Sequence, residues 1–314
     1  MPYIYSSAYE SYRDSVPLLR PLYLDMPECD EAYRHPSAYF FGPSLLAYPV
    51  HTPGVGERYT AVTRVWLPEG RWYGWFDKKS YTAGFHTVMS DLEAFPLFVR
   101  SGVPVVTQPY SARMATAVPE DLNVRIFCGF EESENGAENA EKLCGASVLY
   151  EDDGISLNGS SVRTAISLDW QHGTLRVHSS GDLSLLPEER TWHVECIGFA
   201  PTAVIHQGEG ISTTYDASRN ALCFSLQTPV AQGWEVQLEH AALAEDTWLS
   251  RIYARLSHMQ SDNSEKENAW QLIKKQGRSF SCLGSLRAVC HTPGMADCLE
   301  EYLVAYDGHD AENP

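Results

Sequence analysis

Three consecutive carboxylates, Glu151, Asp152 and Asp153, follow an apolar run in the segment VLYEDDG and precede Gly154. Adjacent carboxyl groups in different surroundings take different pKa values, which suits proton transfer, and their oxygens suit a hard metal ion. The alternative is a turn, because Asp-Gly after a strand is ordinary turn sequence. A metal would also need oxygen ligands from elsewhere in the chain. We therefore interpret the segment as an acidic turn, and we expect mutation of Asp152 to change stability and not turnover.

A second acidic stretch, LDMPECDE at residues 24–31, follows a short apolar run and offers Asp25 and Glu28 as a general acid or base. The alternative is a solvated loop at the end of a strand. A functional assignment has to rest on a complete site, and this stretch does not supply one. We favour the loop, and we expect Arg20 to form an internal salt bridge in an intact barrel and not a substrate contact.

A cluster of large aromatic residues could form a platform on which sugar rings stack. Its members are Trp66, Trp72, Tyr73, Trp75 and Phe76. Alternation within RWYGWFD predicts instead that some of these rings point into a β-sandwich core while others pack against a barrel, since large aromatics contribute much to core stability.

Histidines and cysteines could bind a metal, but their spacing does not favour it. The histidines lie singly on different expected strands: His51, His86, His172, His178, His193 and His206. The group Cys282, Cys290, His291 and Cys298 could be imagined as zinc ligands, yet its eight-residue spacings match no usual ligand pattern. The eight cysteines include no CxxC pair, so we expect reduced thiols and no metal site.

The overall charge excludes some classes of partner. The chain has 314 residues with 23 Lys and Arg against 41 Asp and Glu, a net charge of -18. Nucleic acids and anionic membranes both require clustered positive charge, so neither is an expected partner. No apolar run approaches the roughly 20 residues that span a bilayer, and the N-terminus has no basic segment followed by a hydrophobic stretch. We therefore expect a cytoplasmic protein.

Periodicity predicts a mainly β chain with helices at both ends. Tyr5, Ala8, Tyr9 and Tyr12 have helical spacing, and the apolar run at residues 16–24 predicts a buried strand. Short β-prone runs separated by turn residues begin near Ser44, as in antiparallel sandwiches. The expected strands are SLLAYPV, TAVTRVWLP, RWYGWFD, HTVMSD, PLFVR, NVRIFC, ASVLYE, VRTAISLDW, LRVHS, TWHVECI, TAVIH, STTYD, ALCFSLQ and GWEVQLEH.

Two other regions differ from this β pattern. Residues 128–146 are polar, acidic and rich in Gly and Asn, which predicts a solvated loop or a disordered insertion. After residue 243, the runs DTWLSRIYARLSHMQ, KENAWQLIKK and MADCLEEYLVAYD predict helices separated by SDNSE and TPG.

Several segments together resemble the C-terminal part of glycoside hydrolase family 31, the α-glucosidase and α-xylosidase family. They are MPYIYSSAYESYRDSVPLLRPLYLDMPECDEAY, YFFGPSLLAYPVHTPG, VWLPEGRWYGWFDKKSYTAG, FPLFVRSGVPVV and VLYEDDG. These segments occur in the family's order between Met1 and Gly154. Beyond Gly154 the β pattern is compatible with the family but contains no matching motif.

The resemblance implies a mainly β fold with two antiparallel β-sandwich domains. Residues 1–43 would be the last helix and strand of a (β/α)8 catalytic barrel, most of which is missing. Residues 44–107 would form a proximal sandwich, residues 108–242 a distal sandwich and residues 243–314 a small helical appendage. The family segment similar to LDMPECDE does not hold the catalytic acids, which also favours a loop there.

The resemblance implies a hydrolase of carbohydrate metabolism whose catalytic groups are absent from these residues. Family members hydrolyse α-glycosidic bonds with retention, through an Asp nucleophile in a Trp-x-Asp-Met-Asn-Glu motif and an Asp acid/base in a Gly-Asp-Asn context. Neither motif occurs here. Retention needs two carboxyl groups roughly 5 to 5.5 Å apart, and the barrel site is assembled from loops of all its strands. We therefore assign no catalytic, cofactor-binding or metal residue and expect the chain alone to be inactive.

The resemblance implies an α-glucoside or α-xyloside as the substrate of the parent enzyme. It does not choose between them, because the selecting residues lie in barrel loops. The alternative is a non-catalytic β-sandwich module that binds carbohydrate or protein. In either case, the first forty residues would expose apolar surface and strand edges. We expect them to be disordered, misdocked or prone to association, and to be the first site of limited proteolysis.

Overall fold

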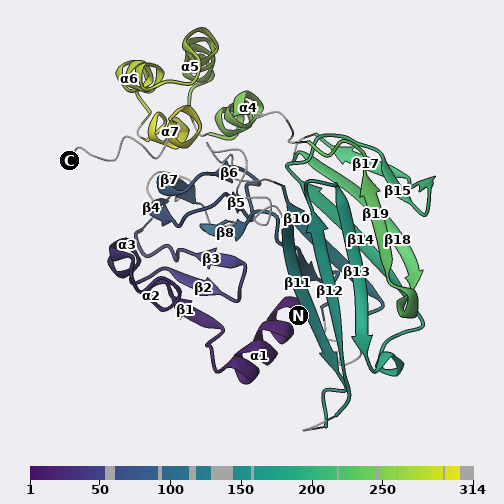
Figure 1. Cartoon of the computed structure of the whole chain (residues 1–314). Helices are drawn as coiled ribbons and strands as arrows, with labels where there is room; N and C mark the ends of the chain where they lie inside the picture. Colours follow the sequence, from purple (N-terminus) through teal and green to yellow (C-terminus); the bar gives the residue numbers. More distant parts are fainter. Residues whose placement is uncertain are drawn as a thin grey trace.

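The computed structural model describes residues 1–53, 61–90, 94–112, 118–128, 144–156, 159–217, 219–242, 244, 248–259, 261–292 and 294–304. These residues form a mostly β protein with several sheets and few helices, as predicted (Figure 1). Most of the acidic segment at residues 128–146 lies outside the described residues. No helix among the described residues is long and apolar enough to cross a membrane.

The N-terminal segment contains three helices and one short strand. These are α1 (Pro2–Asp14), β1 (Leu19–Pro21), α2 (Leu22–Asp25) and α3 (Asp30–Arg34). The helix α1 was predicted from its tyrosine spacing. The buried strand expected over residues 16–24 is wrong, because β1 covers only three residues at a sheet edge and Leu19 and Leu24 are 55% and 52% exposed. Pro21 cannot donate a ladder hydrogen bond, and the chain turns helical directly after it.

The first β region consists of a six-stranded antiparallel sheet and a two-stranded one. The larger sheet has the order β1-β2-β3-β8-β5-β6, with β2 (Tyr39–Phe41), β3 (Leu45–Ala47), β8 (Leu97–Arg100), β5 (Trp72–Gly74) and β6 (Ser80–Tyr81). The smaller pairs β4 (Ala61–Leu67) with β7 (Gly84–Ser90). Their core includes Leu22, Phe40, Leu46, Trp72 and Phe98.

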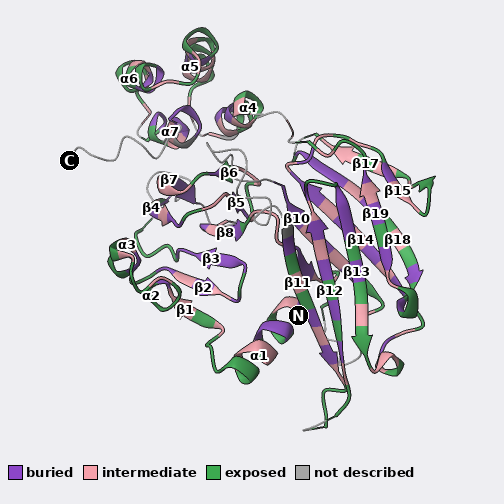
Figure 2. Ribbon diagram, viewed as in Figure 1, coloured by how far each residue is buried: buried purple, intermediate pink, exposed green. Residues whose placement is uncertain are grey.

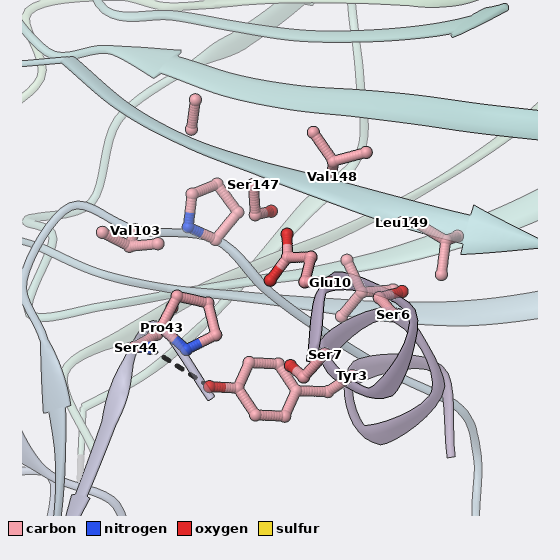
Figure 3. Close-up of a pocket in the computed structure, with 13 residues that line it drawn as sticks. Tyr3, Ser6, Ser7, Glu10, Pro43, Ser44, Val103, Ser147, Val148 and Leu149 are labelled. Atoms are coloured by element: carbon pink, nitrogen blue, oxygen red, sulfur yellow. Dashed lines mark hydrogen bonds between the residues drawn. The ribbon is translucent and has the colours of Figure 1, made fainter. Parts of the chain in front are cut away.

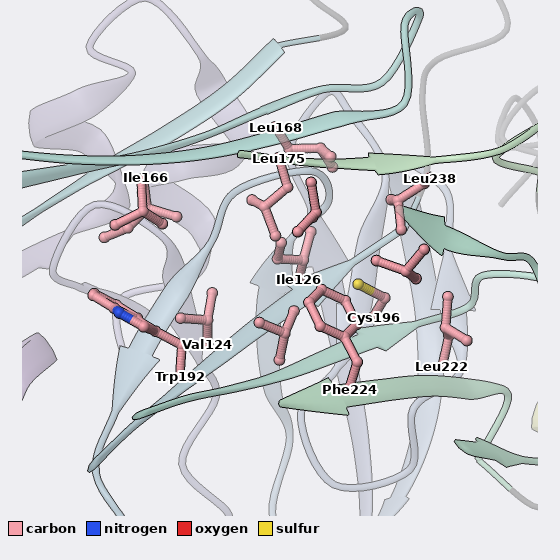
Figure 4. Close-up of a cluster of buried hydrophobic side chains, with 14 of the residues drawn as sticks. Val124, Ile126, Ile166, Leu168, Leu175, Trp192, Cys196, Leu222, Phe224 and Leu238 are labelled. Atoms are coloured by element: carbon pink, nitrogen blue, oxygen red, sulfur yellow. The ribbon is translucent and has the colours of Figure 1, made fainter. Parts of the chain in front are cut away.

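Two further sheets pack face to face and form what we call the distal sandwich (Figure 4). One has the order β17-β18-β14-β10-β9, with β17 (Thr213–Asp216), β18 (Ala221–Pro229), β14 (Glu189–Ile197), β10 (Asp121–Phe127) and β9 (Val105–Thr107). The other has the order β11-β12-β13-β19-β15-β16, with β11 (Cys144–Asp152), β12 (Ser161–Asp169), β13 (Thr174–Gly181), β19 (Trp234–Leu238), β15 (Val204–His206) and β16 (Glu209–Gly210). Two short 3-10 helices, Leu183–Leu185 and Val230–Gln232, lie between strands.

Side chains from both sheets of the distal sandwich interdigitate in one core. Val124, Ile126, Ile166, Trp192 and Phe224 are among its buried members (Figure 4). The strands alternate buried and less buried residues, as in β14 and β12, which is the pattern that predicted them. One pair departs from the antiparallel expectation: β10 and β14 run parallel, because the chain passes through β11, β12 and β13 of the opposite sheet between them.

Four helices follow the sheets: α4 (Trp248–His258), α5 (Asn263–Gln276), α6 (Phe280–Val289) and α7 (Asp297–Leu303). They share a core of their own that includes Ile252, Ile273 and Leu299. The sequence predicted α4, α5 and α7 but not α6, whose apolar residues are interrupted by Gly284. Ser279 caps α6 by accepting a hydrogen bond from Cys282 N at 3.1 Å, which is a recognised helix start.

Candidate functional site

The three carboxylates of VLYEDDG have separate sets of partners. Glu151, at the end of β11, forms an ion pair with Arg190 on β14. Its two oxygens accept hydrogen bonds from Nη1 and Nη2 of Arg190 at 3.0 and 2.9 Å, and Arg190 Nε donates to the carbonyl of Pro119 at 3.1 Å. The Arg190 side chain is 0% exposed and that of Glu151 is 8% exposed. The pair therefore links the two sheets of the distal sandwich inside the protein.

The other two carboxylates form the turn that follows β11. Asp152 accepts a hydrogen bond from Gly154 N at 2.9 Å, and Gly154 has a φ of +65°, which favours glycine. Asp153 accepts from the Ser156 hydroxyl at 2.6 Å and from the N–H groups of Ser156 and Ile155 at 2.8 and 3.0 Å. These bonds, with the Ser156 hydroxyl foremost, hold the pKa of Asp153 at about 2. The segment is an acidic turn, as predicted, and the burial of Glu151 was not foreseen.

Charged residues of LDMPECDE also have partners within the chain. Asp25 accepts hydrogen bonds from Nε and Nη2 of Arg20 at 2.8 and 2.7 Å, so Arg20 forms the internal salt bridge that the sequence suggested. Glu31 pairs with Arg34 and lies 3.6 Å from His35 Nε2. Asp25 and Glu31 are thus held in ion pairs. The expected loop over residues 24–31 is wrong at both ends, because Asp25 ends α2 and Glu31 lies in α3.

The aromatic cluster packs inside the first β region and against its neighbour. Trp72 and Tyr73 are buried, and the Trp66 ring stacks on His35 with centroids 6.1 Å apart. Trp75 contacts Phe127 of β10 with ring centroids 5.8 Å apart. Core packing, which the alternation predicted, accounts for Trp72 and Tyr73, whereas Trp75 packs against β10 and not against a barrel. Phe76 is 42% exposed.

The histidines are dispersed and bind local groups. His172 Nδ1 lies 2.8 Å from Asp169, His193 Nδ1 lies 2.9 Å from Ser225, and His206 Nδ1 lies 2.8 Å from the carbonyl of Glu235. Within the part of the chain that the structure describes, no three His, Cys, Asp or Glu side chains are grouped as metal ligands would be.

The helix α1 is fastened to β11 by stacked aromatic rings. Figure 1 shows α1 beside the edge strand β11. The Tyr9 and Tyr150 rings are nearly parallel, with centroids 3.5 Å apart and planes at 6°. Arg163 Nη2, on the adjoining β12, donates a hydrogen bond to Tyr9 Oη at 2.7 Å. The tyrosine of VLYEDDG therefore positions the N-terminal helix.

Two hydrogen bonds complete the attachment. Tyr5 Oη donates to Asp152 Oδ1 at 2.5 Å, and Tyr150 N donates to Ser6 Oγ at 2.9 Å. The bond to Asp152 is the main reason that the pKa of Tyr5 is raised to about 12. We call this set the α1 clasp: Tyr5, Ser6, Tyr9, Tyr150 and Asp152. The helix is docked, contrary to the expectation of a disordered or misdocked N-terminus, because the clasp binds it to a strand far along the chain.

The N-terminal segment exposes several large apolar residues to solvent, and Figure 2 shows exposed stretches in α1, α2 and α3. Tyr12 is 83% exposed. We call this set the N-terminal apolar surface: Ile4, Tyr12, Val16, Leu19, Tyr23, Leu24 and Tyr33. In contrast, Ser6 and Ser7 of α1 are buried. A helix with small polar residues inside and apolar residues outside is reversed relative to an ordinary surface helix.

A cavity of about 330 Å³ lies between α1, the edge of β11 and the loops before β3 and β9 (Figure 3). Tyr3, Ser6, Ser7 and Glu10 line it from α1. The facing walls comprise Pro43, Ser44, Val103, Pro104, Val106 and residues 146–149. No sequence motif indicated this cavity, because its walls come together only when α1 docks.

A comparison with protein families agrees with the motifs in the sequence. The family model described as "Glycosyl hydrolase family 31 C-terminal domain" matches residues 15–105. Curated relatives extend the similarity to about three quarters of the chain. Residues 15–105 thus match the C-terminal domain of glycoside hydrolase family 31.

The relatives of this family 31 region are much longer proteins. "Alpha-xylosidase" of Saccharolobus solfataricus is 30% identical over 158 residues, 50% of this chain and 19% of that protein. "Alpha-glucosidase 2" of Bacillus thermoamyloliquefaciens is 21% identical over 229 residues, 71% of this chain and 26% of that protein. "Neutral alpha-glucosidase AB" of Homo sapiens is 26% identical, with 76% of this chain and 25% of that protein covered. The chain thus spans about a quarter or less of these relatives.

Solved structures share the fold. The Flavobacterium johnsoniae GH31 dextranase complexed with glucose has a TM-score of 0.64 and 19% identity, with 76% of this chain and 31% of that chain covered. The GH31 alpha-xylosidase of Xanthomonas citri has a TM-score of 0.54 and 25% identity, with 78% of this chain and 23% of that chain covered.

Proposed function

We propose that this chain is the C-terminal portion of a retaining α-glycosidase, of the α-glucosidase or α-xylosidase type, and that it supports the catalytic barrel. The N-terminal apolar surface is the observation on which the proposal rests. An exposed apolar patch of this kind marks a surface that another protein surface covers. The α1 clasp holds that surface in a fixed orientation, which suits docking of a rigid body.

In this proposal residues 1–43 contain the last helix and strand of a (β/α)8 barrel. Residues 44–107 form the proximal sandwich, residues 108–242 the distal sandwich and residues 243–314 a helical appendage. The α-glucoside or α-xyloside is then a substrate of the parent enzyme, bound at the carboxyl ends of the barrel strands. The role of this chain is to hold the last barrel elements in place. A cytoplasmic location is part of the proposal, and cell fractionation tests it.

Among the described residues, the acids considered above do not form a catalytic pair. The described carboxylates of VLYEDDG and Asp25 are engaged in the ion pairs and turns described above. Retaining hydrolysis needs an attacking and a protonating carboxyl on either side of the scissile bond. We expect the purified chain to release no p-nitrophenol from p-nitrophenyl α-glucoside or α-xyloside, and hydrolysis that copurifies with the chain would contradict this.

The DNA immediately upstream of the Met1 codon tests the proposal most directly. An open frame that encodes a Trp-x-Asp-Met-Asn-Glu motif is expected. A promoter and a ribosome-binding site there would favour the alternative, a free-standing β-sandwich module that binds carbohydrate or protein. That module would have no use for half of a barrel repeat.

Substitution of the N-terminal apolar surface gives a second test. If an upstream barrel portion exists, co-expression with this chain should yield a complex on size-exclusion chromatography. Leu19→Asp and Leu24→Asp should abolish the complex, because a charge at a buried interface is strongly unfavourable. Glu235→Gln, on an exposed strand of the distal sandwich, is the matched control and should leave it intact. A complex that tolerates both aspartates would contradict the assigned surface.

A further inference from the structure

The cavity beside α1 has polar groups that are satisfied and polar groups that are not. Tyr3 Oη donates to the carbonyl of Phe41 at 2.7 Å and accepts from Ser44 N at 3.1 Å. Ser6 Oγ donates to the carbonyl of Pro2 at 2.9 Å in addition to its bond in the clasp. These two side chains have no need of a further partner. The remaining polar groups include the Glu10 carboxylate, the Ser147 hydroxyl and the free edge of β11.

Glu10 is a half-buried carboxylate without a matched cation. Among the described residues it makes no hydrogen bond and no ion pair, and desolvation raises its pKa above the ordinary value. Two guanidinium groups influence it, but each is held by another carboxylate: Arg13 by Asp14 at 2.6 Å and Arg20 by Asp25 at 2.7 Å. Figure 3 shows the Glu10 side chain directed from α1 toward Ser147.

The opposite wall offers hydrogen-bonding groups. Ser147 Oγ is buried and has no partner within the described structure. On β11, Tyr150 N points away from β12, since it donates to Ser6. In an antiparallel pair, alternate residues direct both backbone groups to the same side, so Val148 and Ala146 also present their N–H and C=O groups to the open edge. Buried polar groups in native proteins nearly always have partners, so the Ser147 hydroxyl indicates an occupant.

We propose that this cavity is a binding site for a small organic cation that bears a primary ammonium group. The ammonium lies between the Glu10 carboxylate, the Ser147 hydroxyl and the carbonyl of Val148, all of which accept hydrogen bonds. Its short apolar chain packs against Pro43, Val103, Pro104 and Val106, which line the same cavity. A volume of about 330 Å³ lies within the range of small-molecule pockets. The inference does not rest on the proposed glycosidase role.

The choice of a cation follows from the charges that surround the cavity. Glu10 is the only ionisable side chain among its lining residues other than the phenol of Tyr3. Bonds from an ammonium to a carboxylate are charge-assisted and stronger than those between neutral groups. A neutral alcohol of the same shape would leave the carboxylate charge uncompensated. The net charge of -18 also favours the approach of cations over anions.

The test uses n-propylammonium chloride as the probe and the whole chain as the protein. Isothermal titration calorimetry should detect binding of n-propylammonium and no binding of n-propanol or of sodium chloride at equal ionic strength. Glu10→Gln should weaken the affinity by about tenfold or more, because it removes the charge from a charge-assisted hydrogen bond. The matched control is Glu235→Gln, an exposed carboxylate of the distal sandwich that lies outside the cavity lining, which should leave the affinity unchanged.

Amide chemical shifts locate the bound probe independently of any variant. Resonances of Ser147 and Val148 should shift on titration, while those of α5 and α6 should not. Glu10→Gln should fold normally, as judged by circular dichroism, because it removes a desolvated charge without changing shape. Equal affinity for n-propanol, equal affinity in Glu10→Gln, or shifts confined to other parts of the chain would each overturn the proposal.

Discussion

The buried ion pair between Glu151 and Arg190 leads to a stability prediction that the structure allows us to quantify. Glu151→Gln keeps the shape of the side chain but removes its charge. Arg190 then remains 0% exposed without a carboxylate, although its bond to the Pro119 carbonyl survives. Removal of one partner from a buried pair costs about 3 to 5 kcal/mol, since an uncompensated charge stays in the interior. That is a large share of the roughly 5 to 15 kcal/mol by which domains are stable.

Urea titration, followed by circular dichroism and by tryptophan fluorescence, measures this effect. Because m-values in urea are about 1 to 3 kcal/mol per molar, a loss of this size should lower the midpoint by roughly 2 M. The matched control is Glu235→Gln, which breaks the Arg176–Glu235 pair across β13 and β19, where the side chains are 56% and 55% exposed. That midpoint should change little, since exposed pairs are screened by solvent.

A double variant separates the pair from its individual residues. Glu151→Leu with Arg190→Met replaces both charges by apolar groups of similar size, and such replacements in buried pairs are often neutral. We expect the urea midpoint of the double variant to lie closer to the wild-type midpoint than the midpoint of Glu151→Leu alone or of Arg190→Met alone. The reasoning is refuted if Glu151→Gln shifts the midpoint no more than Glu235→Gln does.

Three further predictions concern the turn, the clasp and the buried thiols. Asp152→Asn should speed hydrogen exchange of the α1 amides by about tenfold, because it weakens the hydrogen bond from Tyr5. Exchange in the distal sandwich should change little. Unchanged exchange in α1 would exclude a role for this contact. The pKa of Asp153 is lowered to about 2 in the folded chain, so its stabilising contribution is complete above the unfolded value near 3.8 and is lost as pH falls through 2. The midpoint difference between wild type and Asp153→Asn should therefore shrink over that range, and a constant difference would argue against it. Burial raises the pKa of the Cys128 and Cys196 thiols, so both should resist Ellman's reagent until the protein is denatured, as quantitative thiol titration with peptide mapping would reveal.

Most of the β fold could be predicted from the sequence because the relevant signal is local. Alternation of apolar and polar residues along β12 and β14 follows from one buried sheet face, and each strand named from the sequence corresponds to a strand in the structure. The apolar run at residues 16–24 failed as a strand because periodicity cannot reveal that β1 lies at an edge. The helix α6 was missed because Gly284 and short side chains weaken its pattern.

The site was harder to predict because its contacts join distant parts of the chain. Helical spacing of Tyr5 and Tyr9 indicated α1 but not the side that would be covered, and nothing local links them to Tyr150. Local sequence also could not show that Glu151 is buried while Asp152 and Asp153 are not. Glu151 is buried because Arg190 lies opposite it in the other sheet. The sequence predicted an acidic turn from its neighbours and motifs, and the structure supplied the partners of each acid.

The α1 clasp also determines the order of events during synthesis. Tyr5 leaves the ribosome 147 residues before Asp152, its partner in the clasp. At synthesis rates of about 5 to 20 residues per second, α1 waits roughly 7 to 30 seconds for β11 to be made. During that interval the helix has neither its strand nor a cover for its tyrosines. The nascent chain should therefore be a client of ribosome-associated chaperones until β11 and β12 have emerged and paired.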